Sequence, residues 1–200
     1  KTATTIGDYV AATNAGLAIS AALVDRERTG RGRRVDISLR DGLLAVQAGW
    51  WALYFANGTQ PERTGTASPY LAPNQVFATA DGYLALAIVS DRHFAILTDS
   101  LGRPDLLERY PTNEVRMADR HALTEELSDM FRHAPTEVWV AQLEAAGLPV
   151  GRLLDFAGVA ADPQIRHNEM IIETDHPRAG VVRLVGSPLR LDGSPASAAA

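Results

Sequence analysis

The feature that most constrains this chain is the stretch of residues 6–32, IGDYVAATNAGLAISAALVDRERTGRG. A Gly7-Asp8 pair opens a long run of Ala, Leu, Ile and Val, and residues 10–24 carry no charged side chain. Apolar groups cover most of the girth of such a segment, which predicts a buried helix over residues 9–28.

Asp8 is expected at the mouth of this helix, where two roles remain open. As an N-cap, its carboxylate would accept hydrogen bonds from backbone N–H groups. As a reactive group, it would lie where amides and the helix dipole meet a ligand. The spacing alone favours the cap.

A basic turn follows the helix, and Gly30 within it is suited to the left-handed conformation that ends a helix. Its arginines are Arg26, Arg28, Arg31, Arg33 and Arg34. Arginine forks suit phosphate groups, so one interpretation is a phosphate contact. The favoured interpretation is a solvated helix-to-strand turn whose cations complement the helix C-terminus.

Residues 34–39 alternate between polar and apolar side chains, which predicts a strand with one face on the core. Asp41 is then expected to cap a second helix over residues 42–57. That helix carries the aromatic side chains Trp50, Trp51, Tyr54 and Phe55. One interpretation of such a patch is the wall of a ligand site, but it is more often part of a core or of a subunit interface.

Residues 59–69, TQPERTGTASP, are rich in turn-forming residues and predict a domain boundary. The segment NQVFATADGYLALAIV then predicts two strands around Asp81-Gly82. Helices are expected over residues 91–101 (capped by Ser90), 117–132 and 136–146. Residues 149–154 are expected to be extended, and Asp162-Pro163 to begin a short helical turn. The segments MIIETDH and GVVRLVG are expected to form a second strand pair. Strands and helices in this order indicate an α+β domain.

The composition excludes several classes of function. A net charge of −5 argues against a nucleic-acid binder. The chain has no Cys, which fits a reducing, cytoplasmic location. No apolar run is long enough to cross a membrane, and the five histidines form no HxH or HExxH pair, so no metal site is expected.

Several motifs together resemble the family III CoA-transferases. They are the Gly7-Asp8 opening, the R-x-R-T-G-x-G turn, RVDISLRDGLL, the APxxxFxTxDG hairpin and HPRAGVVRLVGSPLRL, and they span residues 6–191 in the family's order. The resemblance implies that Asp8 is the catalytic nucleophile and that Leu39 packs against bound CoA.

The resemblance also implies an α/β fold. Residues 1–60 would be part of a Rossmann-like large CoA-binding domain (helix–strand–helix), residues 61–190 a small α+β domain, and residues 191–200 a return linker. Family members are about twice this long, so the chain is expected to be an internal piece of an interlocked homodimer. The two apolar helices would then be buried against a second chain or against absent segments.

The implied reaction moves CoA from an acyl-CoA to a carboxylic acid through an aspartyl anhydride and an aspartyl-CoA thioester. CoA is a substrate here, and neither a metal nor a resident cofactor is implied. Two alternatives remain: an α-methylacyl-CoA racemase in which Asp8 is an acid/base, and a non-catalytic fragment or oligomerisation module. Ser68-Pro69 replaces a His-Pro of many relatives and only Gly65 stands where formyl-CoA transferases have a run of glycines, which argues against formyl-CoA:oxalate specificity.

Overall fold

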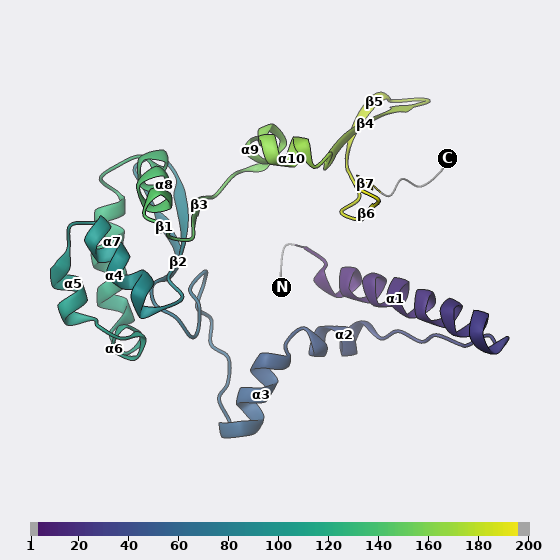
Figure 1. The fold of residues 1–200 in the computed structure, drawn as a ribbon, viewed down its shortest axis with the longest axis horizontal. Helices are drawn as coiled ribbons and strands as arrows, with labels where there is room; N and C mark the ends of the chain where they lie inside the picture. The colour runs from purple at the N-terminus through teal and green to yellow at the C-terminus, as the bar shows by residue number, and fades with distance from the viewer. Residues whose placement is uncertain (1–3, 196–200) are drawn as a thin grey trace. The chain divides into compact units, whose positions relative to one another are not determined.

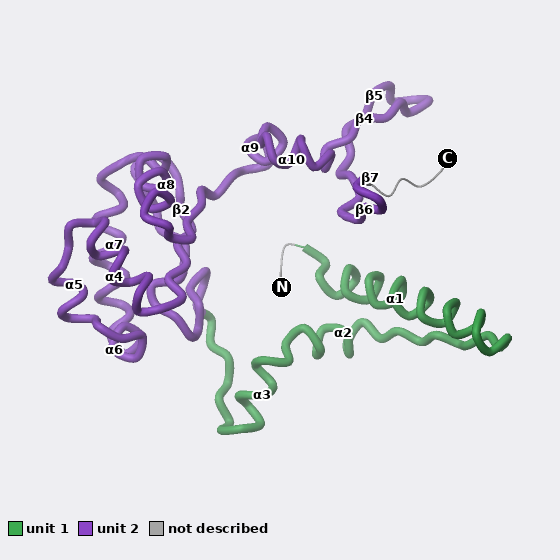
Figure 2. The backbone as a smooth tube through the Cα atoms, viewed as in Figure 1, with its two compact units in different colours: residues 1–63 green, residues 64–200 purple. Residues whose placement is uncertain are grey.

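The computed structural model describes residues 4–195 (Figure 1). The chain divides into two compact units, residues 1–63 and residues 64–200 (Figure 2). Of the predicted return linker, residues 196–200 lie outside the described part. The strands all come after residue 73 in the described chain, so each sheet belongs to the second unit.

The described part of the first unit consists of α1 (Ile6–Thr29), α2 (Leu39–Ala45) and α3 (Ala48–Asn57). The long helix predicted over 9–28 is confirmed and begins three residues before the predicted start. Gly30 ends it with φ 69°, and its N–H donates to the Arg26 carbonyl at 2.8 Å. Gly58 ends α3 in the same left-handed conformation.

The strand predicted over residues 34–39 is wrong. Residues 31–38 form neither helix nor strand, and Val35 and Ile37 remain exposed. A strand exists only when its backbone groups pair with a neighbour. The described part of the first unit supplies no second strand, so the alternating pattern has no sheet to join.

The single helix predicted over residues 42–57 is also wrong, because α2 and α3 are separate helices. Ser38, not Asp41, is the N-cap of α2: its backbone is extended and its hydroxyl accepts from the Asp41 N–H at 3.2 Å. The end of α2 tightens as the Gln47 N–H donates to the Leu44 carbonyl at 3.1 Å, and Gln47 leaves the helical conformation.

The described part of the second unit is a mixture of short helices and strands. Its helices are α4 (Asp91–Ser100), α5 (Pro104–Arg109), α6 (Asn113–Ala118), α7 (Arg120–Phe131), α8 (Thr136–Ala145), α9 (Phe156–Ala161) and α10 (Pro163–His167). Its strands are β1 (Asn74–Ala78), β2 (Tyr83–Ala87), β3 (Val150–Arg152), β4 (Ile171–His176), β5 (Gly180–Val185), β6 (Arg190–Leu191) and β7 (Ser194–Pro195).

The predicted first hairpin is confirmed as β1 and β2, which pair antiparallel with Phe77 opposite Leu84. The extended segment after Pro149 adds β3 to the free edge of β2, giving an antiparallel sheet of order β1-β2-β3. The second strand pair is confirmed as β4 and β5. Ser90 caps α4 and Asp162 caps α10, as their positions in the sequence predict.

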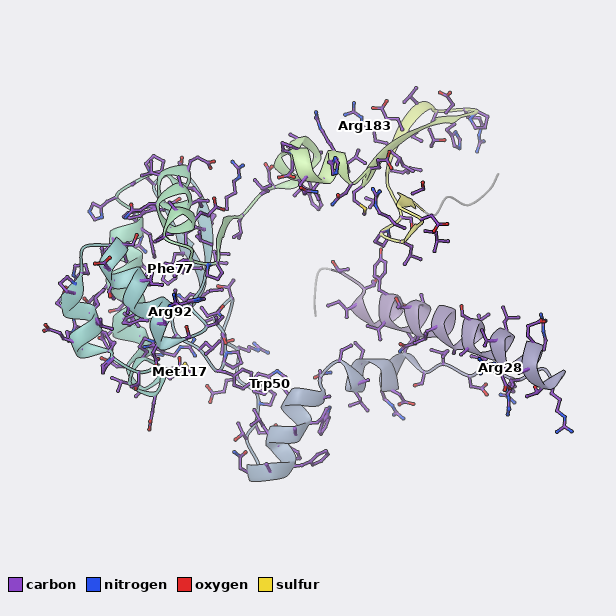
Figure 3. The ribbon with its side chains drawn as sticks, in the orientation of Figure 1. Arg28, Trp50, Phe77, Arg92, Met117 and Arg183 are labelled. Atoms are coloured by element: carbon purple, nitrogen blue, oxygen red, sulfur yellow. The ribbon has the colours of Figure 1, made fainter. Side chains whose placement is uncertain are left out.

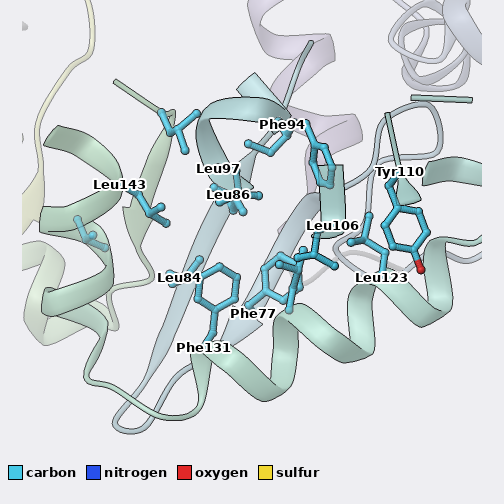
Figure 4. Packing of buried hydrophobic residues seen from close by; sticks show 14 residues of the cluster. Phe77, Leu84, Leu86, Phe94, Leu97, Leu106, Tyr110, Leu123, Phe131 and Leu143 are labelled. Atoms are coloured by element: carbon cyan, nitrogen blue, oxygen red, sulfur yellow. The ribbon is translucent and has the colours of Figure 1, made fainter. Parts of the chain in front are cut away.

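One face of the β1-β2-β3 sheet forms the hydrophobic core (Figure 4). Phe77 and Leu84 point from the sheet toward Leu123 and Phe131 of α7, and the Phe77 and Phe131 rings lie 5.1 Å apart. Trp139 of α8 meets Phe131 edge-on. The described residues after 150 include no buried side chain, so this core belongs to the part of the unit between β1 and β3.

A buried arginine ties the segment that enters β1 to the helices. Arg116 of α6 is 1% exposed. Its guanidinium donates to the Ala72 carbonyl at 2.6 Å, the Tyr110 carbonyl at 3.2 Å and the Asp91 carboxylate at 2.7 Å. Phe94 lies under the guanidinium at 4.5 Å. The hydrogen bond from Arg116 lowers the pKa of Asp91.

The turn between β1 and β2 caps α8, a helix that begins 55 residues further along the chain. The Asp81 carboxylate accepts from the Thr136 N–H at 2.8 Å and the Thr136 hydroxyl at 2.9 Å, at the start of α8. The residue before α8 is Pro135, which gives no side-chain cap. These bonds from Thr136 lower the pKa of the Asp81 carboxyl.

Arg116→Met should destabilise the protein by about 3 kcal/mol, because the buried Ala72 and Tyr110 carbonyls lose their donor. Arg132→Met is the matched control, since Arg132 forms an exposed ion pair with Asp129 and should cost less than about 1 kcal/mol. Urea unfolding followed by circular dichroism measures both. Equal losses for the two variants would contradict the assignment.

Asp81→Asn should lower the melting temperature at pH 7 and should matter less in acid. Because folding lowers the pKa of Asp81, its stabilising effect is complete above the pKa of the unfolded chain and disappears as the pH falls through the folded pKa. The melting temperature of Asp81→Asn should therefore approach that of the wild type as the pH is lowered from 7 to 3. Asp99→Asn, an exposed change on α4, should show no such convergence.

Candidate functional site

Asp8 lies in the first turn of α1 rather than before it. Thr5 occupies the N-cap position, and the Asp8 N–H donates to its carbonyl at 3.1 Å. The Asp8 side chain is exposed and accepts no hydrogen bond from residues 4–195. The N-cap role that the spacing favours is therefore wrong, and the carboxylate remains available to another group.

The turn that carries Asp8 packs against α2. A Cβ built on Gly7 would lie 3.3 Å from Leu43 Cδ1, and one built on Gly42 would lie 3.0 Å from Val10 Cγ1. Gly42 is the one buried residue in the described part of the first unit. The two helices therefore approach most closely at the end where Asp8 lies.

Leu39, the residue expected against CoA, is the first residue of α2. Its side chain is 51% exposed, so it has apolar surface available for a ligand. Asp8 and Leu39 thus belong to two helices in direct contact, although 30 residues of sequence lie between them.

Local ion pairs neutralise part of the basic turn after α1. Arg33 bonds Asp25 at 2.6 Å and Arg34 bonds Asp36 at 2.8 Å. The Asp25 bond raises the pKa of the Arg33 guanidinium. These pairs fit the solvated turn better than a phosphate contact. Arg28, near the C-terminal end of α1 (Figure 3), has no acidic partner among the described residues.

The aromatic side chains of α3 form an exposed cluster. Trp51 and Phe55 stack with centroids 5.6 Å apart, and Phe55 is 77% exposed. A cavity of about 330 Å³ lies beside this helix, lined by Gln47, Trp50, Trp51, Tyr54, Gln60 and Pro61. Trp50, one of the residues that line the cavity, lies on α3 (Figure 3).

The segment around Ser68 is fixed by side chains of α6 and α7. Asn113 accepts from the Ala72 N–H at 3.1 Å and donates to the Tyr70 carbonyl at 2.9 Å. Arg120 donates to the Ser68 carbonyl at 3.0 Å. The segment is therefore held in one conformation within the second unit.

All five histidines lie in the second unit. Among residues 4–195, no three His, Cys, Asp or Glu side chains come together in a way that could hold a metal ion. His176 has a structural role instead, because its Nδ1 accepts from the Arg178 and Ala179 N–H groups in the β4–β5 turn. None of the helices in the described chain combines the length and apolar character that a membrane span needs.

A comparison against protein families identifies the family of this chain. Residues 1–200 match the profile of CoA-transferase family III. The chain therefore belongs to the family III CoA-transferases, and its fold is the mixed helix-and-strand fold of that family.

Relatives and solved structures agree with this assignment. The chain is 36% identical to the acetyl-CoA:oxalate CoA-transferase of Acetobacter aceti, over 88% of this chain and 44% of that protein. It is 31% identical to the human succinyl-CoA:glutarate CoA-transferase, over 86% of this chain and 40% of that protein. A CAIB/BAIF family protein from Brucella suis superposes with a TM-score of 0.81 at 32% identity, covering 98% of this chain and 51% of that one. The chain spans about half the length of the relatives it matches.

The sequence patterns did not predict the roles of two residues of this region: Ser38 as the N-cap of α2 and Gly42 at the contact between α1 and α2. Ser38 was missed because the carboxylate of Asp41 was taken as the cap, although serine followed three residues later by an acid is itself a helix-start signal. Gly42 gave no signal of a close approach, because it lies at the first position of the helix predicted over residues 42–57 rather than inside it.

Proposed function

We propose that the complete protein is an acyl-CoA:carboxylate CoA-transferase in which Asp8 is the nucleophile. The observation that carries this proposal is the exposed Asp8 carboxylate in the first turn of α1, which caps nothing and accepts no hydrogen bond from the described residues. The family membership of the chain supports the reaction class.

The reaction begins when the Asp8 carboxylate attacks the thioester carbonyl of the donor and expels CoA thiolate, which gives a mixed anhydride. The thiolate then attacks the aspartyl carbonyl, releases the donor acid and leaves an aspartyl-CoA thioester. The acceptor carboxylate attacks this thioester, and the expelled thiolate takes the acyl group from the second anhydride. Asp8 is regenerated, and no step consumes a proton. Covalent capture divides one difficult exchange into easier steps.

The start of α1 and the neighbouring Leu39 both support this chemistry. Each attack creates a negatively charged oxygen, and the N-terminal end of α1 presents the positive end of the helix dipole. Leu39, exposed at the start of the neighbouring helix, would contact the nucleotide-bearing substrate through its apolar side chain.

The names of the relatives suggest which substrates to test. The human and Acetobacter aceti relatives, and the succinyl-CoA:mesaconate CoA-transferase of Haloarcula hispanica, are named for short dicarboxylic acids. We therefore propose a short dicarboxylate as acceptor and succinyl-CoA or acetyl-CoA as donor.

The apolar surfaces of the first unit support the interlocked homodimer and the large-domain assignment of residues 1–60. Leu17 of α1 and Phe55 of α3 are 71% and 77% exposed. Side chains of this kind are normally covered by another segment or another chain. A monomer found by light scattering of the full-length enzyme would contradict the dimer.

Asp8→Asn should abolish turnover and leave the fold and CoA affinity nearly unchanged, because the amide keeps the size of the side chain but is no nucleophile. Succinyl-CoA given to the wild type without an acceptor should leave CoA attached to the peptide that contains Asp8. Mass spectrometry detects this adduct, and hydroxylamine should remove it. Asp36→Asn, an exposed change in the same unit, is the control.

The same experiment separates the alternatives. A racemase would form no adduct but would exchange the α-proton of its substrate with deuterated water. A protein without catalytic use of Asp8 would lose nothing on Asp8→Asn, and an active Asn variant would therefore exclude both enzymatic roles.

Leu39→Ala should raise the KM for the acyl-CoA roughly fivefold, since about 1 kcal/mol of apolar contact is lost. The kcat should change little, because the contact is equally present before and during the reaction. Leu189→Ala, which truncates a similarly exposed leucine in the second unit, should leave both constants unchanged. An unaltered KM for Leu39→Ala would remove Leu39 from the binding site.

A further inference from the structure

We propose that Gly42 of α2 is a positioning residue for the Asp8 carboxylate. The inference rests on the proposed function, because it concerns how the nucleophile is held. Gly42 permits a close contact between α1 and α2, and this contact fixes where the first turn of α1 meets the thioester carbonyl.

The backbone of α2 does not itself require glycine at this position. Gly42 lies inside the helix and does not have the positive φ of Gly30 or Gly58. Glycine in a helix is less favourable than alanine, so its presence there calls for another reason. That reason is space: a Cβ on Gly42 would lie 3.0 Å from Val10 Cγ1 and 3.7 Å from Asn14 Nδ2.

The contact lies on the same end of α1 as Asp8. Gly7, Val10 and Asn14 are three and four residues apart, so they form one face of the helix. Gly42 and Leu43 pack on this face, and Asp8 lies on the adjoining, exposed side. The first turn of α1 is therefore held to α2 directly beside the nucleophile.

This contact cannot be relieved by a simple side-chain rotation. Val10 is β-branched, and such a side chain has one strongly preferred rotamer in a helix. A methyl group at position 42 would instead separate the helices by a few tenths of an ångström. A displacement near 1 Å can cost on the order of a hundredfold in rate.

The test uses the full-length enzyme with the donor on which it turns over fastest. Gly42→Ala should lower kcat, and the rate of CoA attachment to the Asp8 peptide, about tenfold, while KM changes less than about twofold. Gly16→Ala is the matched control, since a Cβ on this glycine of α1 would meet no atom within 4 Å, and the variant should keep both constants. Rates are expressed per folded molecule, as determined from melting curves.

Rescue separates positioning from loss of fold. Val10→Ala removes the methyl group that Gly42→Ala would meet, so the double variant should recover the rate of Val10→Ala alone. Wild-type kcat and adduct rate in Gly42→Ala, or no recovery in the double variant, would overturn the positioning role while leaving the nucleophile in place. An active Asp8→Asn enzyme would overturn the proposed function and this inference together.

Discussion

The packing of the second unit depends on the hydrogen bonds of the buried Arg116 guanidinium. The guanidinium is almost fully removed from water, and its donors reach two backbone carbonyls and one carboxylate in segments that are separate in sequence. A buried charge is tolerated only when its hydrogen bonds are satisfied. Once they are, the chain entering β1, the start of α4 and the end of α5 are held around α6, and the β1-β2-β3 sheet can cover its apolar face with α7 and α8.

The first unit is organised differently. Its described part has no buried core, and α1 and α2 are held together by a close approach of their backbones at Gly42. Its described part buries a single residue, Gly42, and leaves much apolar surface on α1 and α3 exposed. The pairing of α1 with α2 nevertheless gives Asp8 a defined support. We infer that reactivity in this unit depends on helix geometry and that its stability depends on the surfaces that cover these helices in the complete protein.

Several local signals in the sequence were good guides, although the local cap predictions at Asp8 and Asp41 were wrong. Gly30 and Gly58 end helices because their left-handed conformation is a property of the residue itself. Ser90 and Asp162 cap helices within three residues of their own position. The Asp81-Gly82 hairpin follows from turn chemistry and strand patterning. The segments α5, α6 and α9 were missed, since each is only six residues long and its helical pattern is too short to recognise.

The sequence by itself determined the family, the order of the main helices and hairpins, and Asp8 as the candidate nucleophile, because these depend on motifs and on neighbours along the chain. Only the tertiary structure decided that residues 34–39 do not form a strand in this chain, that Asp81 caps α8 from 55 residues away, and that Gly42 meets Val10. The physical reason is the same in each case. The pairing of a strand, the capping of a helix by a remote residue and close packing all depend on which distant segment of the chain lies opposite. No local pattern of side chains specifies that segment.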